Sequence, residues 1–92
     1  MTFFQWDRDK NESNIAKHGY SFDTAKFIWL GYIIESQDTR KDYGEDRFIA
    51  IGEVNGDVLV VVYTWRTPDR RLISARKANH AERQAYYQAI PD

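Results

Sequence analysis

The chain of 92 residues contains no cysteine, and it has only two histidines, two prolines and five glycines. Without cysteine, the protein has no disulfide framework, no thiolate nucleophile and no zinc–thiolate site. Because a secreted domain of this size usually needs disulfides, we expect the protein in a reducing cytoplasm. No apolar run approaches the roughly 18 residues of a spanning helix, and residues 1–10 lack a signal-peptide core. We therefore expect that the protein does not interact with a membrane.

An excess of charge of one sign is also absent. The sequence has 13 Lys and Arg against 14 Asp and Glu, and its net charge of −1 argues against a surface covered in positive charge for nucleic acid. The distribution is uneven, because residues 35–57 sum to −4 and residues 58–92 to +3. Such an asymmetry can create a positive binding face on a neutral protein. The alternative is that these cations are solvated strand ends and one helix face.

The composition is that of a globular protein, with 42% hydrophobic, 29% charged and 15% aromatic residues, and we expect one domain over residues 1–92. The residue pattern predicts strands at 3–6, 32–36, 47–54, 58–66 and 72–76, and helices at 8–18, at 22–30 and from 80 onward. This order indicates an α+β fold, in which a twisted antiparallel sheet carries two N-terminal helices and one C-terminal helix. The polar segment 37–45 is predicted to be a mobile loop.

Capping residues mark the predicted helix ends. Asp7 can cap the first helix, and the run Lys17-His18-Gly19 can end it, because cations and a left-handed glycine are typical of a helix C-terminus. Ser21 can cap the second helix. Asn79 begins the third, and Glu82 has the spacing of its capping-box partner.

A hairpin signal at Asn55-Gly56 predicts that Phe48 lies opposite Tyr63. With the next loop placed at residues 67–70, alternate side chains sort onto two faces. One predicted face is aliphatic and should pack on the helices; it contains Ile49, Ile51, Val60, Val62, Ile73 and Ala75. The other mixes aromatic rings, a hydroxyl and a guanidinium; it contains Phe48, Tyr63, Trp65, Leu72, Ser74 and Arg76.

The mixed face suits single-stranded RNA, because rings stack on bases and arginine binds phosphate. The alternative is that this face is a second, smaller core with Arg76 at its rim. A β-bulge in either strand would invert part of the sorting.

Without cysteine and with only two histidines, the sequence fits few known arrangements of catalytic residues. Two histidines are too few for a histidine metal site, and the sequence contains no glycine-rich phosphate loop or dinucleotide fingerprint. We therefore expect no metal and no cofactor. Metal-independent phosphoryl transfer on RNA remains, because the nucleophile is then the substrate's own 2′-hydroxyl. The protein has only to move protons, a task for histidine or tyrosine, and to stabilise phosphate charge with arginine.

Several segments, in order along nearly the whole chain, resemble the BrnT family of bacterial type II toxins. The matching residues are Trp6-Asp7, Lys10, Asn14, Lys17-His18-Gly19, Phe22, Ala25, Arg47 to Gly52, Val61 to Thr64, Arg66, Ile73 to Ala78, Glu82-Arg83 and Tyr86. The resemblance implies a RelE-like fold and a ribonuclease activity that inhibits translation. It also implies a BrnA-like antitoxin with a ribbon-helix-helix part, through which alone the complex binds operator DNA.

We therefore predict a metal-independent endoribonuclease that acts on RNA, either free or as ribosome-associated mRNA. Arg66 and Arg76 are the expected phosphate ligands, and His18 or Tyr63 is expected to transfer protons. The expected substrate-binding residues are Lys17, Arg47, Phe48, Trp65 and Ser74. The alternative from a different class is a non-catalytic module, whose basic strip binds an acidic antitoxin segment or operator DNA as a co-repressor.

Overall fold

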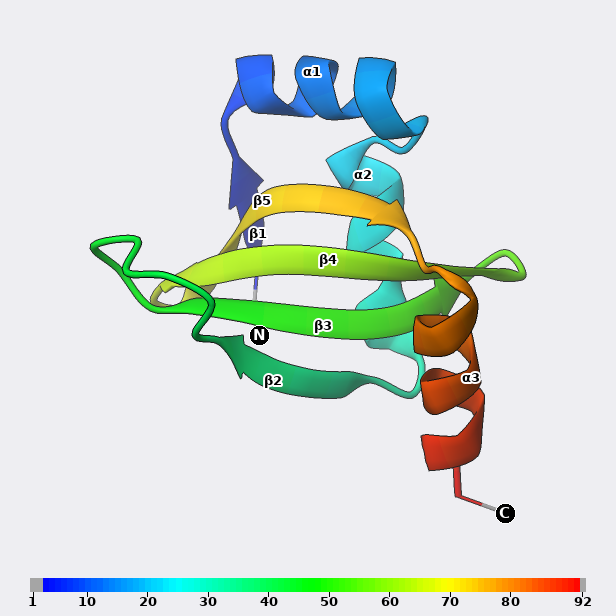
Figure 1. Ribbon diagram of the computed structural model, residues 1–92. Coiled ribbons are helices and arrows are strands. Elements are labelled where there is room, and N and C mark those ends of the chain that lie inside the picture. The colour runs from blue at the N-terminus through cyan, green and yellow to red at the C-terminus, as the bar shows by residue number, and fades with distance from the viewer. Residues whose placement is uncertain (1–2, 92) are drawn as a thin grey trace.

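The computed structural model describes residues 3–91, so residues 1–2 and 92 of the expected domain lie outside it. These residues form a five-stranded sheet with helices on both faces (Figure 1). The strands are β1 (Phe4–Trp6), β2 (Ile34–Asp38), β3 (Arg47–Val54), β4 (Asp57–Arg66) and β5 (Asp69–Lys77). The helices are α1 (Arg8–His18), α2 (Phe22–Ala25), its 3₁₀ continuation η1 (Lys26–Leu30) and α3 (His80–Ala89). The predicted element order and the α+β class are confirmed.

The predicted helix caps are confirmed as well. The Asp7 carboxylate accepts a hydrogen bond from the backbone N–H of Lys10, and Gly19 ends α1 with a φ of 80°. Asn79 and Glu82 form a complete capping box at the start of α3. Among the helices of residues 3–91, none is both long enough and apolar enough to cross a membrane.

The sheet has the strand order β1-β5-β4-β3-β2. Strands β2 to β5 form an antiparallel meander, but β1 runs parallel to β5, with Phe4 beside Arg70 and Trp6 beside Leu72. The predicted antiparallel sheet therefore holds for β2 to β5, whereas β1 joins it in the parallel direction. The chain between β1 and β5 contains two helices and three strands, and a long connection of this kind lets two paired strands run in the same direction.

The hairpin between β3 and β4 follows the predicted register. Asn55 and Gly56 have φ values of 51° and 87°, and Phe48 lies opposite Tyr63. Both turn residues adopt positive φ, which the two-residue loop requires and which Asn and Gly tolerate.

The register between β4 and β5 differs from the prediction. The strands continue to the pair Arg66–Asp69, so the loop is two residues long instead of four. Tyr63 lies opposite Leu72 but Val62 lies opposite Ser74, because β5 contains one extra residue at this point. From Ser74 onward, each side chain of β5 therefore lies on the opposite face of the sheet from the predicted one, because an extra residue in one strand shifts its alternation by one position.

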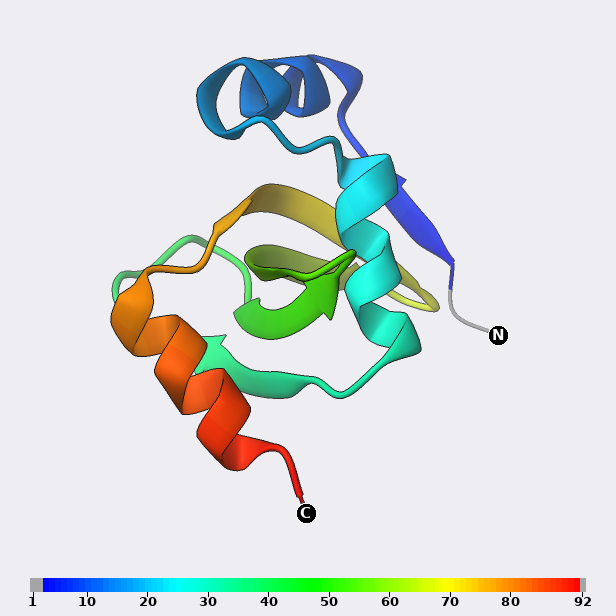
Figure 2. The ribbon, with the colours of Figure 1, turned by 90° about the vertical axis from the view of Figure 1, so that its right-hand side faces the viewer.

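The two faces of the sheet are therefore composed differently from the prediction. The main core lies under α2 and η1, where Phe22, Ala25 and Ile28 pack on a face that includes Tyr63 and Leu72. On the opposite face, α3 covers one end, where its Tyr86 and the preceding Ala78 pack with Val58 and Val60 (Figure 2). The aliphatic face thus packs on a helix only under α3. The face expected to bind RNA is mostly the main core, while Ser74 and Arg76 lie on the aliphatic face, opposite Val62 and Val60.

One buried amide joins α1 to the free edge of β5. Strand β1 ends beside Leu72, and farther along this edge Asn14 takes the place of a neighbouring strand. Its Nδ2 donates to the carbonyl oxygens of Ala75 and Tyr20 at 2.8 Å each, and its Oδ1 accepts from the backbone N–H of Ala75 at 3.0 Å. Asn14 is the buried residue of α1, so this amide, rather than an apolar stripe, is the main attachment of the helix.

We predict that Asn14→Asp lowers the free energy of unfolding by about 2–4 kcal/mol at neutral pH, because a carboxylate cannot donate to the two carbonyl oxygens. Urea denaturation followed by circular dichroism measures the change. Ser13→Ala, at an exposed neighbour of Asn14 in α1, is the control and should stay within about 0.5 kcal/mol of wild type. Equal stability of Asn14→Asp and wild type would contradict this role of the amide.

Candidate active site on the open face of the sheet

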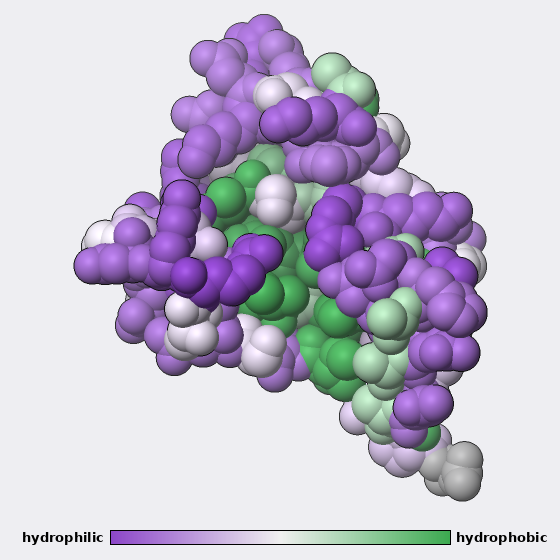
Figure 3. Space-filling view, in the orientation of Figure 1, coloured by the Kyte–Doolittle hydropathy of each residue, from purple (hydrophilic) through white to green (hydrophobic). Residues whose placement is uncertain are grey.

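The part of the sheet that α3 leaves uncovered forms the floor of a concave surface, which we call the groove. Figure 3 shows this floor in green, bordered by purple side chains of α1 above, of the loop 39–46 on the left and of α3 on the right. The half-buried side chains of Ile49, Val62 and Ile73 contribute to the floor. Between α1 and β5 the surface deepens into a cavity of about 220 Å³, lined by Lys10, Ser13, Asn14, Lys17, His18, Ile73 and Ser74.

The α1 wall carries two of the predicted site residues. Lys17 and His18 lie in the last turn of α1, which Gly19 ends, and both line the cavity together with Ser74 of β5. The attachment of Asn14 to Ala75 keeps this turn beside β5. The structure thus brings together Lys17, His18 and Ser74, which are separated in sequence by more than fifty residues.

The α3 wall contains Arg76 and its partner Glu82. Nη1 and Nη2 of Arg76 donate to Oε1 and Oε2 of Glu82 at 2.8 Å each, and the Arg76 side chain remains 39% exposed. Glu82 Oε1 also accepts from the backbone N–H of Asn79, so the capping box of α3 orients this pair. The hydrogen bond to Glu82 raises the pKa of Arg76, and the same bond lowers the pKa of Glu82.

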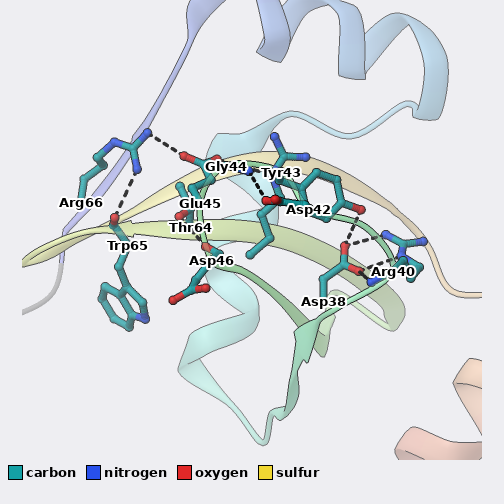
Figure 4. Close-up of polar contacts among 11 residues, drawn as sticks. Asp38, Arg40, Asp42, Tyr43, Gly44, Glu45, Asp46, Thr64, Trp65 and Arg66 are labelled. Atoms are coloured by element: carbon teal, nitrogen blue, oxygen red, sulfur yellow. Dashed lines mark hydrogen bonds and ion pairs between the residues drawn. The ribbon is translucent and has the colours of Figure 1, made fainter.

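The third wall is the loop 39–46, which is organised by one buried carboxylate. Asp38, whose side chain is 1% exposed, accepts from Nε and Nη2 of Arg40 at 2.8 Å each and from the Tyr43 hydroxyl at 3.1 Å (Figure 4). The hydrogen bond from Arg40 holds the pKa of Asp38 far below its usual range. The Arg47 guanidinium stacks on the Tyr43 ring at 4.1 Å, so Arg47 also belongs to this wall.

Three predicted site residues lie away from the groove. Tyr63 is 1% exposed in the main core, its hydroxyl donates to Glu35 at 2.8 Å, and its ring contacts those of Phe48 and Trp65. Burial raises the pKa of Tyr63. The prediction that these three residues share a surface with Arg76 is wrong, because the bulge in β5 moves Arg76 to the other face.

The aromatic rings of this second face already have a cationic partner, Arg70, which sequence reasoning did not single out. Its guanidinium lies 4.7 Å from the ring of Trp29, 5.3 Å from that of Tyr63 and 4.6 Å from that of Trp65. Stacking of arginine on aromatic faces is favourable when the group is desolvated. The rings expected to stack on RNA bases therefore enclose a guanidinium of the protein itself.

Arg66 lies far from Arg76. Arg66 is opposite Asp69 at one end of β4, whereas Arg76 is opposite Val60, so about 20 Å of strand separates the two positions. Arg66 donates to Glu45 at 3.0 Å and borders a separate cavity of about 270 Å³. The structure therefore does not bring the two predicted phosphate ligands together.

Sequence reasoning missed the organised loop, because segment 37–45 was interpreted only as polar and mobile. The spacing of Asp38, Arg40 and Tyr43 is the signal that could have revealed it, since side chains so close in sequence can share one turn. Within residues 3–91, the structure gathers no group of three or more His, Asp or Glu side chains that could hold a metal ion.

We predict that Asp38→Asn lowers the thermal midpoint at pH 7. Because the pKa of Asp38 is depressed in the folded protein, the carboxylate stabilises the fold above its unfolded pKa of about 3.9. That stabilisation is lost as the pH falls toward the depressed value. The difference in thermal midpoint between wild type and Asp38→Asn should therefore become smaller below about pH 4 in calorimetric scans. Asp9→Asn, which changes an exposed carboxylate of α1, is the control. A difference in thermal midpoint between wild type and Asp38→Asn that stays constant down to pH 2 would contradict the prediction.

Comparison with known proteins agrees with the fold described above. The model of a family described as the ribonuclease toxin BrnT of type II toxin–antitoxin systems matches residues 6–82. The crystal structure of the ribonuclease toxin BrnT from Brucella abortus is 31% identical and has a TM-score of 0.62, over 87% of this chain and 99% of that chain. A search of curated proteins finds no match. The chain therefore belongs to the BrnT family of ribonuclease toxins of type II toxin–antitoxin systems.

Proposed function

We propose that the protein is an endoribonuclease that binds single-stranded RNA in the groove and cleaves it without a metal ion. Membership of a family of ribonuclease toxins supports RNA as the substrate. The observation that carries the proposal is the position of Arg76, a partly exposed guanidinium on the same face as Ser74. Ser74 in turn shares a cavity with Lys17 and His18. Arg76, which can bind an anion, and His18, which can transfer a proton, therefore both lie near the part of β5 that contains the Ser74 hydroxyl.

In the proposed reaction, the 2′-hydroxyl of the RNA loses its proton to a base, and its oxygen attacks the adjacent phosphorus. The bond to the 5′-oxygen breaks, and this oxygen receives a proton. The products are a 2′,3′-cyclic phosphate and a 5′-hydroxyl, so no atom from another reactant is needed. The protein supplies charge stabilisation and two proton transfers.

Arg76 stabilises the charge that builds on the phosphate oxygens. A guanidinium has five N–H donors, and Glu82 engages one on each Nη. Nη1 also donates to the carbonyl oxygen of Lys77 at 3.4 Å. The donors on Nε and on the outer side of Nη2 are therefore the ones available to a phosphate. Glu82 acts as a positioning residue, because a guanidinium fixed before the substrate arrives loses less entropy on binding.

His18 transfers the protons in this proposal, because histidine is suited to proton transfer near neutral pH. Tyr63, the other candidate, has its hydroxyl on the opposite face, bound to Glu35. Lys17 attracts the RNA backbone, and Ser74 donates a hydrogen bond to it. Arg47, on the loop wall, assists electrostatically.

The cavity at the end of β4 offers a place for RNA beyond the scissile bond. Arg66 and Trp65 border it, together with Phe48. Trp65 remains 38% exposed although the Arg70 guanidinium stacks on its ring, so part of this side chain is accessible to a base. We assign these residues to substrate binding rather than to catalysis.

The family also supports a biological setting. Membership of a type II toxin–antitoxin family supports a small antitoxin partner that neutralises the protein. We propose that the toxin inhibits translation in the cytoplasm. A BrnA-like partner with a ribbon-helix-helix part would bind operator DNA on behalf of the complex.

We predict that Arg76→Gln reduces single-turnover cleavage of a single-stranded RNA by about 10²–10³-fold, because the variant loses the charged donor to the transition state. Cleavage by wild type should resist EDTA and should stop when the scissile nucleotide carries a 2′-deoxyribose. The control is Arg8→Gln, an 89% exposed arginine of α1 whose Nε lies 3.6 Å from Glu12.

Thermal melts of each variant will check that it is folded. Tight antitoxin binding without any RNA cleavage would favour the alternative, a non-catalytic co-repressor. Cleavage that EDTA abolishes, or that tolerates the 2′-deoxy substitution, would overturn the proposed chemistry.

We also predict that induced expression of the wild-type protein in bacteria arrests growth, and that co-expression of its antitoxin restores it. Arg76→Gln should remove the arrest while leaving antitoxin binding measurable, because it changes the chemistry and not the fold. Colony counts after induction measure the effect. Full toxicity of a folded Arg76→Gln variant would contradict the assignment of Arg76.

A further inference from the structure

A second arginine faces the floor of the groove from the wall opposite Arg76. We propose that Arg40, held in place by Asp38, is a phosphate-binding residue of the groove and grips the RNA backbone together with Arg76. This inference rests on the proposed function, since it assigns a further contact to the same substrate. It concerns the loop 39–46.

The register of the sheet places the anchor of Arg40 on the groove side. Asp38 is the last residue of β2 and lies opposite Arg47, two residues before Ile49. Because alternate residues of a strand share a face, Asp38 lies on the same face as Ile49, Val62 and hence Ser74. An arginine bound to the Asp38 carboxylate is therefore on the groove face of the sheet.

The hydrogen bonds of Arg40 leave its outer edge available. Asp38 engages the Nε–H and one hydrogen of Nη2, so the end of the guanidinium, with Nη1 and the second hydrogen of Nη2, is free of this pair. The side chain is 69% exposed. Two parallel N–H groups at the end of a guanidinium match two oxygens of a phosphate. Arg76 is bound differently, because Glu82 accepts from Nη1 and Nη2 at the end of its guanidinium and leaves the side that contains Nε available.

Asp38 also supplies rigidity. Its carboxylate binds the backbone N–H and the guanidinium of Arg40 as well as the Tyr43 hydroxyl, so three groups of the loop converge on one buried residue. A long arginine side chain normally loses rotamer freedom when it binds a ligand. Here that loss is already incurred in the free protein, which favours phosphate binding.

The two arginines are close enough to influence each other. The positive charge of Arg40 acts to lower the pKa of Arg76, against the larger effect of Glu82. Two guanidinium groups that repel each other across an apolar floor gain when an anion lies between them. The acidic neighbour Glu45 does not cancel this attraction, because Arg66 and Arg47 already pair with it.

The test measures binding rather than cleavage, with the full-length protein and a single-stranded oligoribonucleotide whose 2′-hydroxyls are all methylated. Fluorescence anisotropy gives Kd over a range of salt concentrations for wild type, Arg40→Gln and the double variant Asp38→Asn/Arg40→Gln. The double variant keeps the net charge of wild type and leaves no buried carboxylate without a partner. Arg8→Gln is the control for loss of one distant positive charge.

We expect Arg40→Gln and the double variant each to raise Kd about tenfold. The slope of log K against log salt should become shallower by about 0.7, the value for one phosphate contact on a single strand. Arg8→Gln should leave both quantities close to wild type. Arg40→Lys keeps the charge without the fork, so it should preserve the slope and lose part of the affinity.

The outcomes separate the two proposals. If wild type binds, Arg76→Gln weakens binding and the double variant matches wild type in Kd and slope, the role of Arg40 is refuted while the proposed function stands. If wild type neither binds nor cleaves RNA, both proposals fall. If Arg40→Gln binds weakly but the double variant binds normally, the loss comes from the unpaired Asp38, and the role of Arg40 is again refuted.

Discussion

The groove depends on one pair of backbone groups at the edge of the sheet. Strand β1 is too short to cover β5, and the amide of Asn14 satisfies both the N–H and the C=O of Ala75 where β1 has ended. This contact fixes a helix that has almost no apolar face. Because α1 lies along β5, its last turn with Lys17 and His18 reaches the same cavity as Ser74. A structural hydrogen bond thus places the residues of the α1 wall.

A second constraint, the bulge in β5, decides which side chains the groove contains. With Tyr63 opposite Leu72 and Val62 opposite Ser74, the strand changes its alternation within one residue. Arg76 therefore lies on the open face, and Tyr63 lies in the main core. The guanidinium of Arg70 stacks on the rings of Trp29, Tyr63 and Trp65. The chemistry of the open face is consequently an apolar floor with charged walls, rather than an aromatic stacking platform.

The positive charge of the groove comes from arginines paired with carboxylates, not from an overall excess of positive residues. Arg76 is bound by Glu82 and Arg40 by Asp38, and each pair uses only part of the donors of its guanidinium. A protein of net charge −1 can in this way present oriented donors to an anion without a broad positive surface. Two of the acids that balance the composition, Asp38 and Glu82, are thus the groups that orient these two arginines.

The sequence alone determined the element order, the helix caps and the β3–β4 register, because each depends on neighbouring residues such as Asn55-Gly56 or Asn79 and Glu82. It also determined the family, through residues spread over most of the chain. Only the tertiary structure decided the parallel pairing of β1, the bulge in β5 and the partners of Arg40 and Arg76. These features depend on contacts between distant segments and on a one-residue shift of register, and a shift of that size exchanges the two faces of a strand.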